Sequence, residues 1–282
     1  MKQIIFVADF FLEHLTGGAE INDNTLINML SEEGLIFDKK QSHTLTEDYI
    51  INNSDKLFVI SNMVNIHPQL LPVLALCDYV IYEHDYKFVS NRNPASFVDF
   101  VVPKEQLINE NFYKNAVSVI CLSKMHRNIF EKNLNLENLT NINCSLFDDE
   151  KISLLLELGK NKKTKEFAVI NTKNPTKRTK DIIEWCNFKN ISYDLISHPD
   201  NNEFLKILSE YKNLIFMTKH PEPTPRIAVE CKLMGINFVA SKKMISVAHE
   251  YWWNWEPEEI ARELKKIRVE AINLFKEILD ET

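Results

Sequence analysis

Two carboxylates in the second half of the sequence have the spacing of a ligand-binding pair. Glu222 and Glu230 are separated by seven residues; the first lies in a proline-rich loop after an apolar run, and the second lies within a predicted helix. The start of such a helix offers free backbone N–H groups and a positive dipole end to an anion. Carboxylates on either side can accept hydrogen bonds from hydroxyls. The pair suits a phosphate between two polyols, as in a nucleotide-sugar; the alternative is a solvated loop Glu and a helix-surface Glu.

A second junction suited to an anion lies earlier in the same half. Residues 159–180 carry eight basic residues and one acid, and Lys177, Arg178 and Lys180 stand where a helix is predicted to begin. Cations at a helix N-terminus oppose the macrodipole, so a bound anion would compensate them. We therefore expect Lys177 and Arg178 to bind a diphosphate, with a solvated basic loop as the alternative.

Two features of the first half fit the edge of a ligand site. Gly17 and Gly18 stand between a predicted strand and a predicted helix, in a chain that has only five glycines. They allow the backbone to approach a ligand closely or to take a positive φ. His84 stands at the end of a later strand, where it can donate a hydrogen bond to a sugar hydroxyl. A plain turn and a structural His are the alternatives. Neither a P-loop nor the G-x-G-x-x-G fingerprint is present.

Strands and helices alternate along the sequence. Runs of β-branched, aromatic and other apolar residues predict four strands in each half, at 3–9, 56–60, 78–83, 117–123, 166–172, 191–196, 213–218 and 236–240. Helices are predicted between them, at 19–33, 124–132, 177–187, 203–211 and 226–234. Apolar strands that alternate with helices imply parallel sheets covered on both faces. In such sheets ligands bind at the carboxyl ends of the strands, where the candidate residues stand.

The repeated order of elements predicts an α/β protein with two Rossmann-like, doubly wound domains. We expect an N-terminal domain over residues 1–145, a polar, Lys-rich linker over 146–165 and a second domain over 166–255. An amphipathic helix over 256–282 is expected to pack back on the body through one apolar face, which carries Ile260, Leu264, Ile267, Ala271, Leu274 and Ile278. The aromatic run 251–255 is expected to dock this helix rather than to stack on a sugar.

Composition narrows the class of protein. A chain of 282 residues with 45% hydrophobic residues can bury the cores of two domains. No apolar run approaches the roughly 20 residues that span a bilayer, and the N-terminus is typical of a buried strand rather than a signal peptide. Five scattered cysteines without C-x-x-C favour a reduced, cytoplasmic protein, and no zinc-type cluster is present. The net charge of −7 disfavours nucleic-acid binding.

In combination, these motifs resemble those of GT-B-fold retaining glycosyltransferases of the large family 4. The resemblance covers most of the chain and rests on five loose motifs that occur in the expected order. They are Gly17–Glu20 with the helix that follows, Glu83–Asp85, the strand that ends at Ser123, Lys177–Arg178, and Glu222–Glu230 with Gly235. The resemblance implies two Rossmann-like domains that face each other across a cleft. It also implies transfer of a hexose from a nucleoside diphosphate sugar, such as a UDP- or GDP-hexose, to a hydroxyl acceptor, a glycan or another molecule, with retention and without a metal or other cofactor.

The resemblance implies roles for the matching residues. Glu222 would bind the donor sugar near its reacting face, and His84 would face that sugar from the other domain; these are the expected catalytic residues. Glu230 would bind the ribose hydroxyls of the nucleotide. Lys177 and Arg178 would neutralise the leaving diphosphate.

Other parts of the resemblance concern the phosphate side of the cleft. Gly17 and Gly18 would line it near the phosphate or the acceptor. Where the family often has Phe-Gly, this chain has Thr224-Pro225, and proline has no N–H for a phosphate. The phosphate would then depend more on Thr224, Arg226, the basic pair and nearby amides. The family's Lys-Gly pair is here Lys-Arg, so the identity of the primary cation stays open.

Three alternatives stay open at this point. A nucleotide-sugar epimerase shares the fold, as does a glycosyltransferase that modifies hydroxylated DNA bases, although the acidic net charge makes a DNA partner less favourable. A catalytically silent GT-B scaffold that binds a partner belongs to another class. The donor base, the sugar, the acceptor and the oligomeric state are left open by the sequence.

Overall fold

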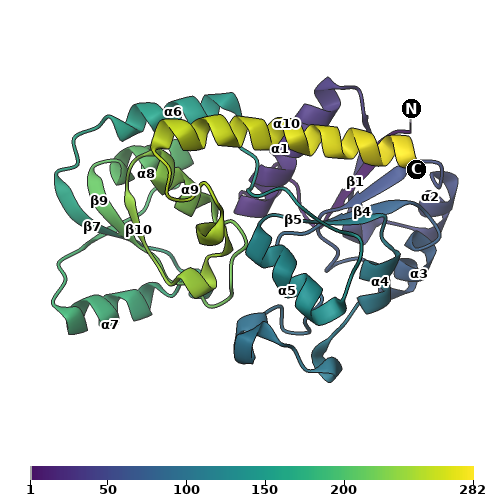
Figure 1. Ribbon diagram of the computed structural model, residues 1–282, viewed down its shortest axis with the longest axis horizontal. Helices are drawn as coiled ribbons and strands as arrows, with labels where there is room; N and C mark the ends of the chain where they lie inside the picture. Colours follow the sequence, from purple (N-terminus) through teal and green to yellow (C-terminus); the bar gives the residue numbers. More distant parts are fainter. Residues whose placement is uncertain (1) are drawn as a thin grey trace. The chain divides into compact units, whose positions relative to one another are not determined.

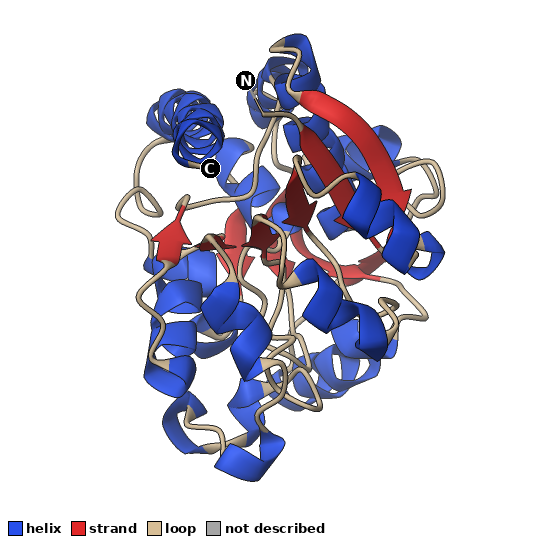
Figure 2. Ribbon diagram, turned by 90° about the vertical axis from the view of Figure 1, so that its right-hand side faces the viewer, coloured by secondary structure: helices blue, strands red, loops and turns tan. Residues whose placement is uncertain are grey.

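A computed structural model describes residues 2–282 of the chain, which form two compact units (Figure 1). The first unit contains the residues up to Leu146 together with Lys266–Thr282, and the second contains Phe147–Lys265. Each unit has one parallel sheet, and helices lie beside the strands (Figure 2). The predicted class, an α/β protein with two parallel-sheet units, is confirmed.

The first unit has a six-stranded sheet in the order β2-β1-β3-β4-β5-β6. Its strands are β1 Ile4–Ala8, β2 Ile36–Gln41, β3 Leu57–Ile60, β4 Tyr79–Tyr82, β5 Ser118–Cys121 and β6 Leu139–Asn141. Strands β1, β3, β4 and β5 are buried along their whole length, as expected for central strands covered on both faces. The chain runs from β1 to β2 on one side of β1 and then crosses to β3 on the other side. The strand order therefore reverses between β1 and β3. This reversal is a topological switch point.

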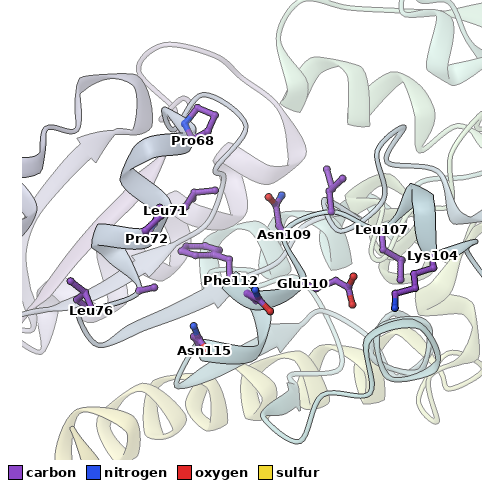
Figure 3. Close-up of a pocket in the computed structure, with 13 residues that line it drawn as sticks. Pro68, Leu71, Pro72, Leu76, Lys104, Leu107, Asn109, Glu110, Phe112 and Asn115 are labelled. Carbon is purple, nitrogen blue, oxygen red and sulfur yellow. The ribbon is translucent and has the colours of Figure 1, made fainter.

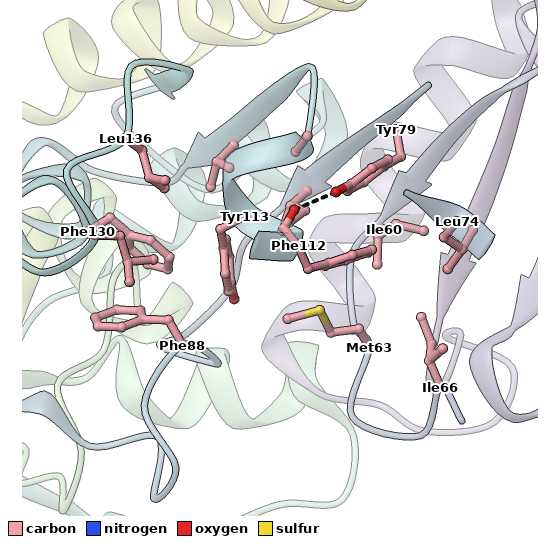
Figure 4. Packing of buried hydrophobic residues seen from close by; sticks show 14 of the residues in the cluster. Ile60, Met63, Ile66, Leu74, Tyr79, Phe88, Phe112, Tyr113, Phe130 and Leu136 are labelled. Atoms are coloured by element: carbon pink, nitrogen blue, oxygen red, sulfur yellow. Dashed lines mark hydrogen bonds between the residues drawn. The ribbon is translucent and has the colours of Figure 1, made fainter. Parts of the chain in front are cut away.

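Helices α1 Gly18–Glu32, α2 Glu47–Asn52, α3 Leu71–Leu74, α4 Glu110–Asn115 and α5 Lys124–Leu134 belong to the first unit. Aromatic side chains from strands, loops and helices build its main core (Figure 4). The Tyr79 ring stacks on Phe112 at 4.5 Å between centroids, and the Tyr79 hydroxyl donates to the Phe112 carbonyl at 2.5 Å. The buried hydroxyl thus has its partner inside the core.

The second unit has a four-stranded parallel sheet in the order β10-β9-β7-β8. Its strands are β7 Lys165–Ile170, β8 Asp194–Ile196, β9 Tyr211–Ile215 and β10 Asn237–Val239, and its helices are α6 Asp149–Gly159, α7 Thr179–Lys189, α8 Asn201–Leu208 and α9 Arg226–Leu233. The switch point of this sheet lies between β7 and β9. Helix α6 ends against α9 at Gly159, where a Cβ atom would lie 3.3 Å from the Leu233 carbonyl oxygen.

Helix α10, Pro257–Glu281, ends the chain, so the predicted C-terminal helix is present. Ile260, Leu264, Ile267, Ala271 and Ile278 on its apolar face are buried. Trp252 and Trp253 are also buried, and the Tyr251 hydroxyl donates to Glu263 on this helix. The aromatic run therefore docks the helix, as expected.

The structure also contains elements that the sequence patterns did not predict. These are β2, β6 and the helices α2, α3, α4 and α6, the last of which lies within the region 146–165 expected as a linker. Helix α7 begins at Thr179, so Lys177 and Arg178 precede it rather than belonging to its first turn. All five cysteines are free thiols. Within residues 2–282, no helix combines the length and the apolar character needed to cross a bilayer.

Candidate active site

The two loops at the switch point of the second unit bring a cation and a carboxylate together. Lys177 lies in the loop after β7, and Glu222 lies in the loop after β9. The Lys177 Nζ atom is 2.7 Å from one Glu222 oxygen and 3.0 Å from the other. The loops are also joined by a backbone hydrogen bond from Lys219 to the Thr176 carbonyl at 2.8 Å. The Phe216 ring centre lies 4.9 Å from the ammonium group, a cation–π contact.

The backbone of Glu222 is held from both sides. Its N–H donates to the Met244 carbonyl and its carbonyl accepts from the Ser246 N–H, each at 2.9 Å. The side chain stays 22% exposed, and that of Lys177 stays 31% exposed. The ion pair therefore faces solvent on a fixed backbone, where a ligand can reach it.

Arg178 has a counterion of its own. Its backbone is left-handed, with φ 49°, and its Nε lies 2.6 Å from the Asp181 carboxylate in the first turn of α7. Lys177 is likewise neutralised by Glu222. Two carboxylates of the protein thus already compensate these cations, and the binding of a diphosphate by Lys177 and Arg178 stays a prediction.

Glu230 is a buried carboxylate in α9. It is 4% exposed and lies one turn after Arg226, the first residue of that helix. Burial raises its pKa, and the charges of Arg226 and Lys151 oppose this rise. The Arg226 guanidinium lies over the Phe147 ring, 3.9 Å from its centre. The alternative of a helix-surface Glu at position 230 is thus excluded.

Thr224 and Arg226 flank Pro225, the N-cap of α9. Both side chains are largely buried, with 8% and 9% exposure. Lys151 on α6 approaches the same region, and its Nζ lies 2.6 Å and 2.9 Å from the side-chain oxygens of Asn201 and Asn202. Burial lowers the pKa of Lys151, with the charge of Glu230 opposing. Sequence reasoning missed Lys151, because it belongs to a helix that was not predicted.

His84 of the first unit forms a dyad with a buried carboxylate. Its Nε2 lies 2.6 Å from an oxygen of Asp23 on α1, and Ser61, at the end of β3, donates to the other Asp23 oxygen. Because a carboxylate can only accept, the contact places a proton on Nε2 and leaves Nδ1 as an acceptor when the ring is neutral. The Tyr82 ring meets the imidazole edge-on at 5.0 Å.

Sequence reasoning did not select Asp23, although the pattern of α1 contains a signal. Asp23 lies three and seven residues before Leu26 and Leu30, on the buried face of the helix. A carboxylate on an apolar helical face requires a partner in the interior. That spacing predicts a buried contact but does not say with which residue.

The two glycines open helix α1. Gly17 is its N-cap with an extended backbone, at φ −129°, so the expected freedom for a positive φ is not used there. A Cβ atom at Gly17 would lie 2.3 Å from a Glu20 carboxylate oxygen. Gly17 therefore makes room for Glu20, whose pKa is raised by burial. Gly18 is the first residue of the helix.

A buried ionic network holds the residues on either side of His84. Lys87 donates to Glu83 and lies 3.1 Å from Asp85, and the Tyr113 hydroxyl donates to the second Glu83 oxygen at 2.5 Å. The Asp85 N–H also donates to Glu83, at 3.0 Å. These contacts fix the backbone that presents His84.

A cavity of about 800 Å³ opens elsewhere on the first unit (Figure 3). Its lining is mainly apolar and includes Leu71, Pro72 and Phe112, together with the charged residues Lys104 and Glu110. It contains none of the predicted site residues. Among residues 2–282, no group of three or more His, Cys, Asp or Glu side chains is placed to hold a metal ion.

Comparison with known proteins gives a result only at the level of structure. No family profile and no curated protein sequence matches the chain. A structure of HepE from Anabaena in complex with UDP and glucose aligns over 94% of this chain and 89% of that chain, with 14% identity and a TM-score of 0.53. Sucrose-phosphate synthase from Thermosynechococcus elongatus aligns over 100% of both chains, with 10% identity and a TM-score of 0.61. The chain has the GT-B fold.

A third similar structure is that of the lipopolysaccharide outer core galactosyltransferase WaaB. It aligns over 98% of this chain and 99% of that chain, with 9% identity and a TM-score of 0.60. The GT-B fold class, with its two parallel-sheet α/β units, is thus confirmed over nearly the whole length of the chain.

Proposed function

We propose that this protein transfers a hexose from a nucleoside diphosphate sugar to a hydroxyl group of an acceptor, with retention at the anomeric carbon. The contact between Lys177 and Glu222 at the switch point of the second unit is the observation that carries the proposal. It puts a group for phosphate and a group for sugar hydroxyls within 3 Å of each other. The GT-B fold and the buried carboxylate of Glu230 support the same ligand.

The donor is proposed to be a UDP-hexose, with a GDP-hexose as the alternative. The structurally similar HepE was solved in complexes with UDP and with UDP-glucose. On this proposal Glu222 accepts hydrogen bonds from the hexose, and Glu230 accepts them from the ribose. The diphosphate lies between them, near the start of α9.

Electrostatic stabilisation of the leaving group is the main catalytic effect in this proposal. Negative charge grows on the diphosphate as its bond to the anomeric carbon breaks. On this proposal that charge is stabilised by the N-terminus of α9 and by four side chains of the same unit, those of Lys177, Arg178, Thr224 and Arg226. Because these groups supply positive charge, we expect transfer without a divalent metal ion, at a rate that EDTA leaves unchanged.

The acceptor oxygen is proposed to attack on the face from which the diphosphate leaves. The bond between acceptor oxygen and anomeric carbon forms as the carbon–phosphate oxygen bond breaks, and the acceptor proton passes to the leaving phosphate oxygen. His84 is proposed as the second catalytic residue, with its orientation set by Asp23. The glycine turn at Gly17 and Gly18 would lie on the acceptor side.

The test is a transfer assay with UDP-, GDP- and ADP-hexoses and a panel of glycan acceptors. We expect Glu222→Ala and Lys177→Ala each to lower turnover by about 100-fold or more, because each removes a charged contact to the transition state. Glu203→Ala and Lys206→Ala are matched controls, since these residues form an exposed ion pair at 2.6 Å on α8. Wild-type rates in both site variants would reject the assigned roles, and the absence of nucleotide binding in calorimetry would favour a silent scaffold.

A further inference from the structure

The ion pair of Lys177 and Glu222 has a consequence for which nucleotides the site accepts. Both oxygens of Glu222 lie within 3.0 Å of the Lys177 ammonium group. An ammonium group has three N–H donors, and the carboxylate engages up to two of them. A diphosphate that approaches Lys177 must therefore displace Glu222 or bind beside its negative charge.

The two kinds of nucleotide differ in what they offer Glu222. A nucleoside diphosphate without a hexose on its terminal phosphate binds the Lys177 ammonium group but brings no hexose hydroxyl to the Glu222 carboxylate. A nucleoside diphosphate sugar takes the cation and supplies hydroxyl groups in its place. The free energy rises when a charged group loses its partner without a replacement, whereas it changes little when one partner is exchanged for another.

The anchoring of both loops confines this exchange to side chains. The Glu222 backbone is bonded to Met244 and Ser246, and the Thr176 carbonyl accepts from Lys219. Lys177 can swing on its four-carbon stem while its backbone stays in place. Since the side chains are 31% and 22% exposed, the exchange requires no opening of a core.

We propose that Glu222 is a specificity-determining residue which, by holding Lys177, disfavours the sugar-free nucleoside diphosphate relative to the nucleotide-sugar. The inference rests on the proposed function and adds to it a means of releasing the spent nucleotide. Once the sugar has been transferred, Glu222 regains Lys177 and weakens the hold on the product. The chemical class that the residue rejects is a diphosphate that carries no hydroxylated ring on its terminal phosphate.

The experiment is calorimetry on the full chain with three probes: inorganic pyrophosphate, UDP and UDP-glucose. In Glu222→Gln we expect pyrophosphate and UDP to bind about twofold to fivefold more tightly, because a partly exposed ion pair no longer competes. We expect UDP-glucose to bind about tenfold more weakly, because hydrogen bonds to a charged group are lost. Glu203→Gln, which removes an equal charge from α8, should change neither.

A second variant links the effect to the cation. In Lys177→Ala with Glu222→Gln, the gain in pyrophosphate affinity should vanish. Glu222→Ala, which also removes the carboxylate, replaces Glu222→Gln if that variant does not fold. Pyrophosphate that binds Glu222→Gln no more tightly than the wild type would overturn the inference while leaving the transferase intact. Failure of all three probes to bind the wild type would overturn both this inference and the proposed function.

Discussion

At the scale of single residues, the candidate groups are charged side chains held by other charged side chains. Lys177 is held by Glu222, and His84 is held by Asp23. Glu230 lies in the field of Arg226, one turn away on the same helix. Each pair keeps a partly or fully buried charge compensated in the absence of a ligand. A ligand that binds one of these charged groups must therefore replace the partner that the group already has.

The dyad of Asp23 and His84 yields a prediction about turnover. Asp23→Asn should lower kcat about tenfold or more with little change in the KM for the donor, since the substituted residue orients the imidazole rather than touching the sugar. The ¹⁵N spectrum of His84 should change from one tautomer to a mixture, because the carboxylate that fixes the Nε2 proton is lost. Asp55→Asn, at an exposed position of the same unit, is the control. An unchanged tautomer and kcat would show that Asp23 does not position His84.

His126 predicts how stability depends on pH. It is fully buried, its Nε2 lies 2.7 Å from the Asp85 carbonyl, and burial lowers its pKa to about 3. A pKa depressed in the folded state stabilises the protein above the unfolded pKa of about 6.5, and this stabilisation is lost as the pH falls toward the folded value. Between pH 7 and pH 5, His126 should account for a loss of about 2 kcal/mol.

The measurement is urea unfolding of the wild type and His126→Gln at pH 7 and pH 5. The variant should start less stable and should lose about 2 kcal/mol less between these pH values. His43→Gln, at an exposed position, should follow the wild type. Parallel curves for the wild type and His126→Gln would contradict the assignment.

At the scale of elements, the candidate residues of each unit lie at the ends of its parallel strands. In the second unit, the loops after β7 and β9 lie side by side at the switch point and carry Lys177 and Glu222. In the first unit, the ends of β3 and β4 carry Ser61 and His84, and α1 carries Asp23 to them. Because parallel strands end at one edge, residues distant in sequence become neighbours.

Helix α10 predicts a contrast between two positions on one element. Phe275 is 1% exposed and packs edge-on against Tyr82 of the first unit, whereas Val269 is 55% exposed. Phe275→Ala should cost about 3–5 kcal/mol in the free energy of unfolding, because it leaves a cavity in the core. Val269→Ala should stay within about 0.5 kcal/mol of the wild type. Thermal and urea unfolding measure both, and equal losses would mean that the apolar face of α10 is not what stabilises the unit.

At the scale of the whole molecule, ligand binding should appear as added stability. A ligand that binds only the folded state raises the free energy of unfolding by about 2.7 kcal/mol at 100 times its Kd. We expect UDP to raise the melting temperature more than GDP or ADP, and Glu230→Gln to reduce this shift, because the ribose contacts are proposed to lie at Glu230. Equal shifts of the melting temperature with all three nucleotides would contradict the proposed preference for a uridine nucleotide.

Much of the fold could be predicted because its strands and helices follow from local sequence patterns. The eight predicted strands are all present, since each is a short apolar run. Strand β2 was missed because it is an edge strand with the largely polar sequence Ile36–Gln41, and β6 was missed because Leu139 is its only apolar residue. Helix α6 was missed because the Lys-rich residues after it gave the whole region the composition of a linker.

The sequence by itself determined the alternation of strands and helices, the two parallel sheets and the residue types that stand at the strand ends. These features depend on residues close together in the sequence, so the spacing of apolar residues along the chain indicates them directly. Only the tertiary structure decided that Lys177 pairs with Glu222 and His84 with Asp23, and that Glu230 is buried. The partners are 45 and 61 residues apart, and the order of the strands, rather than any local pattern, brings them together.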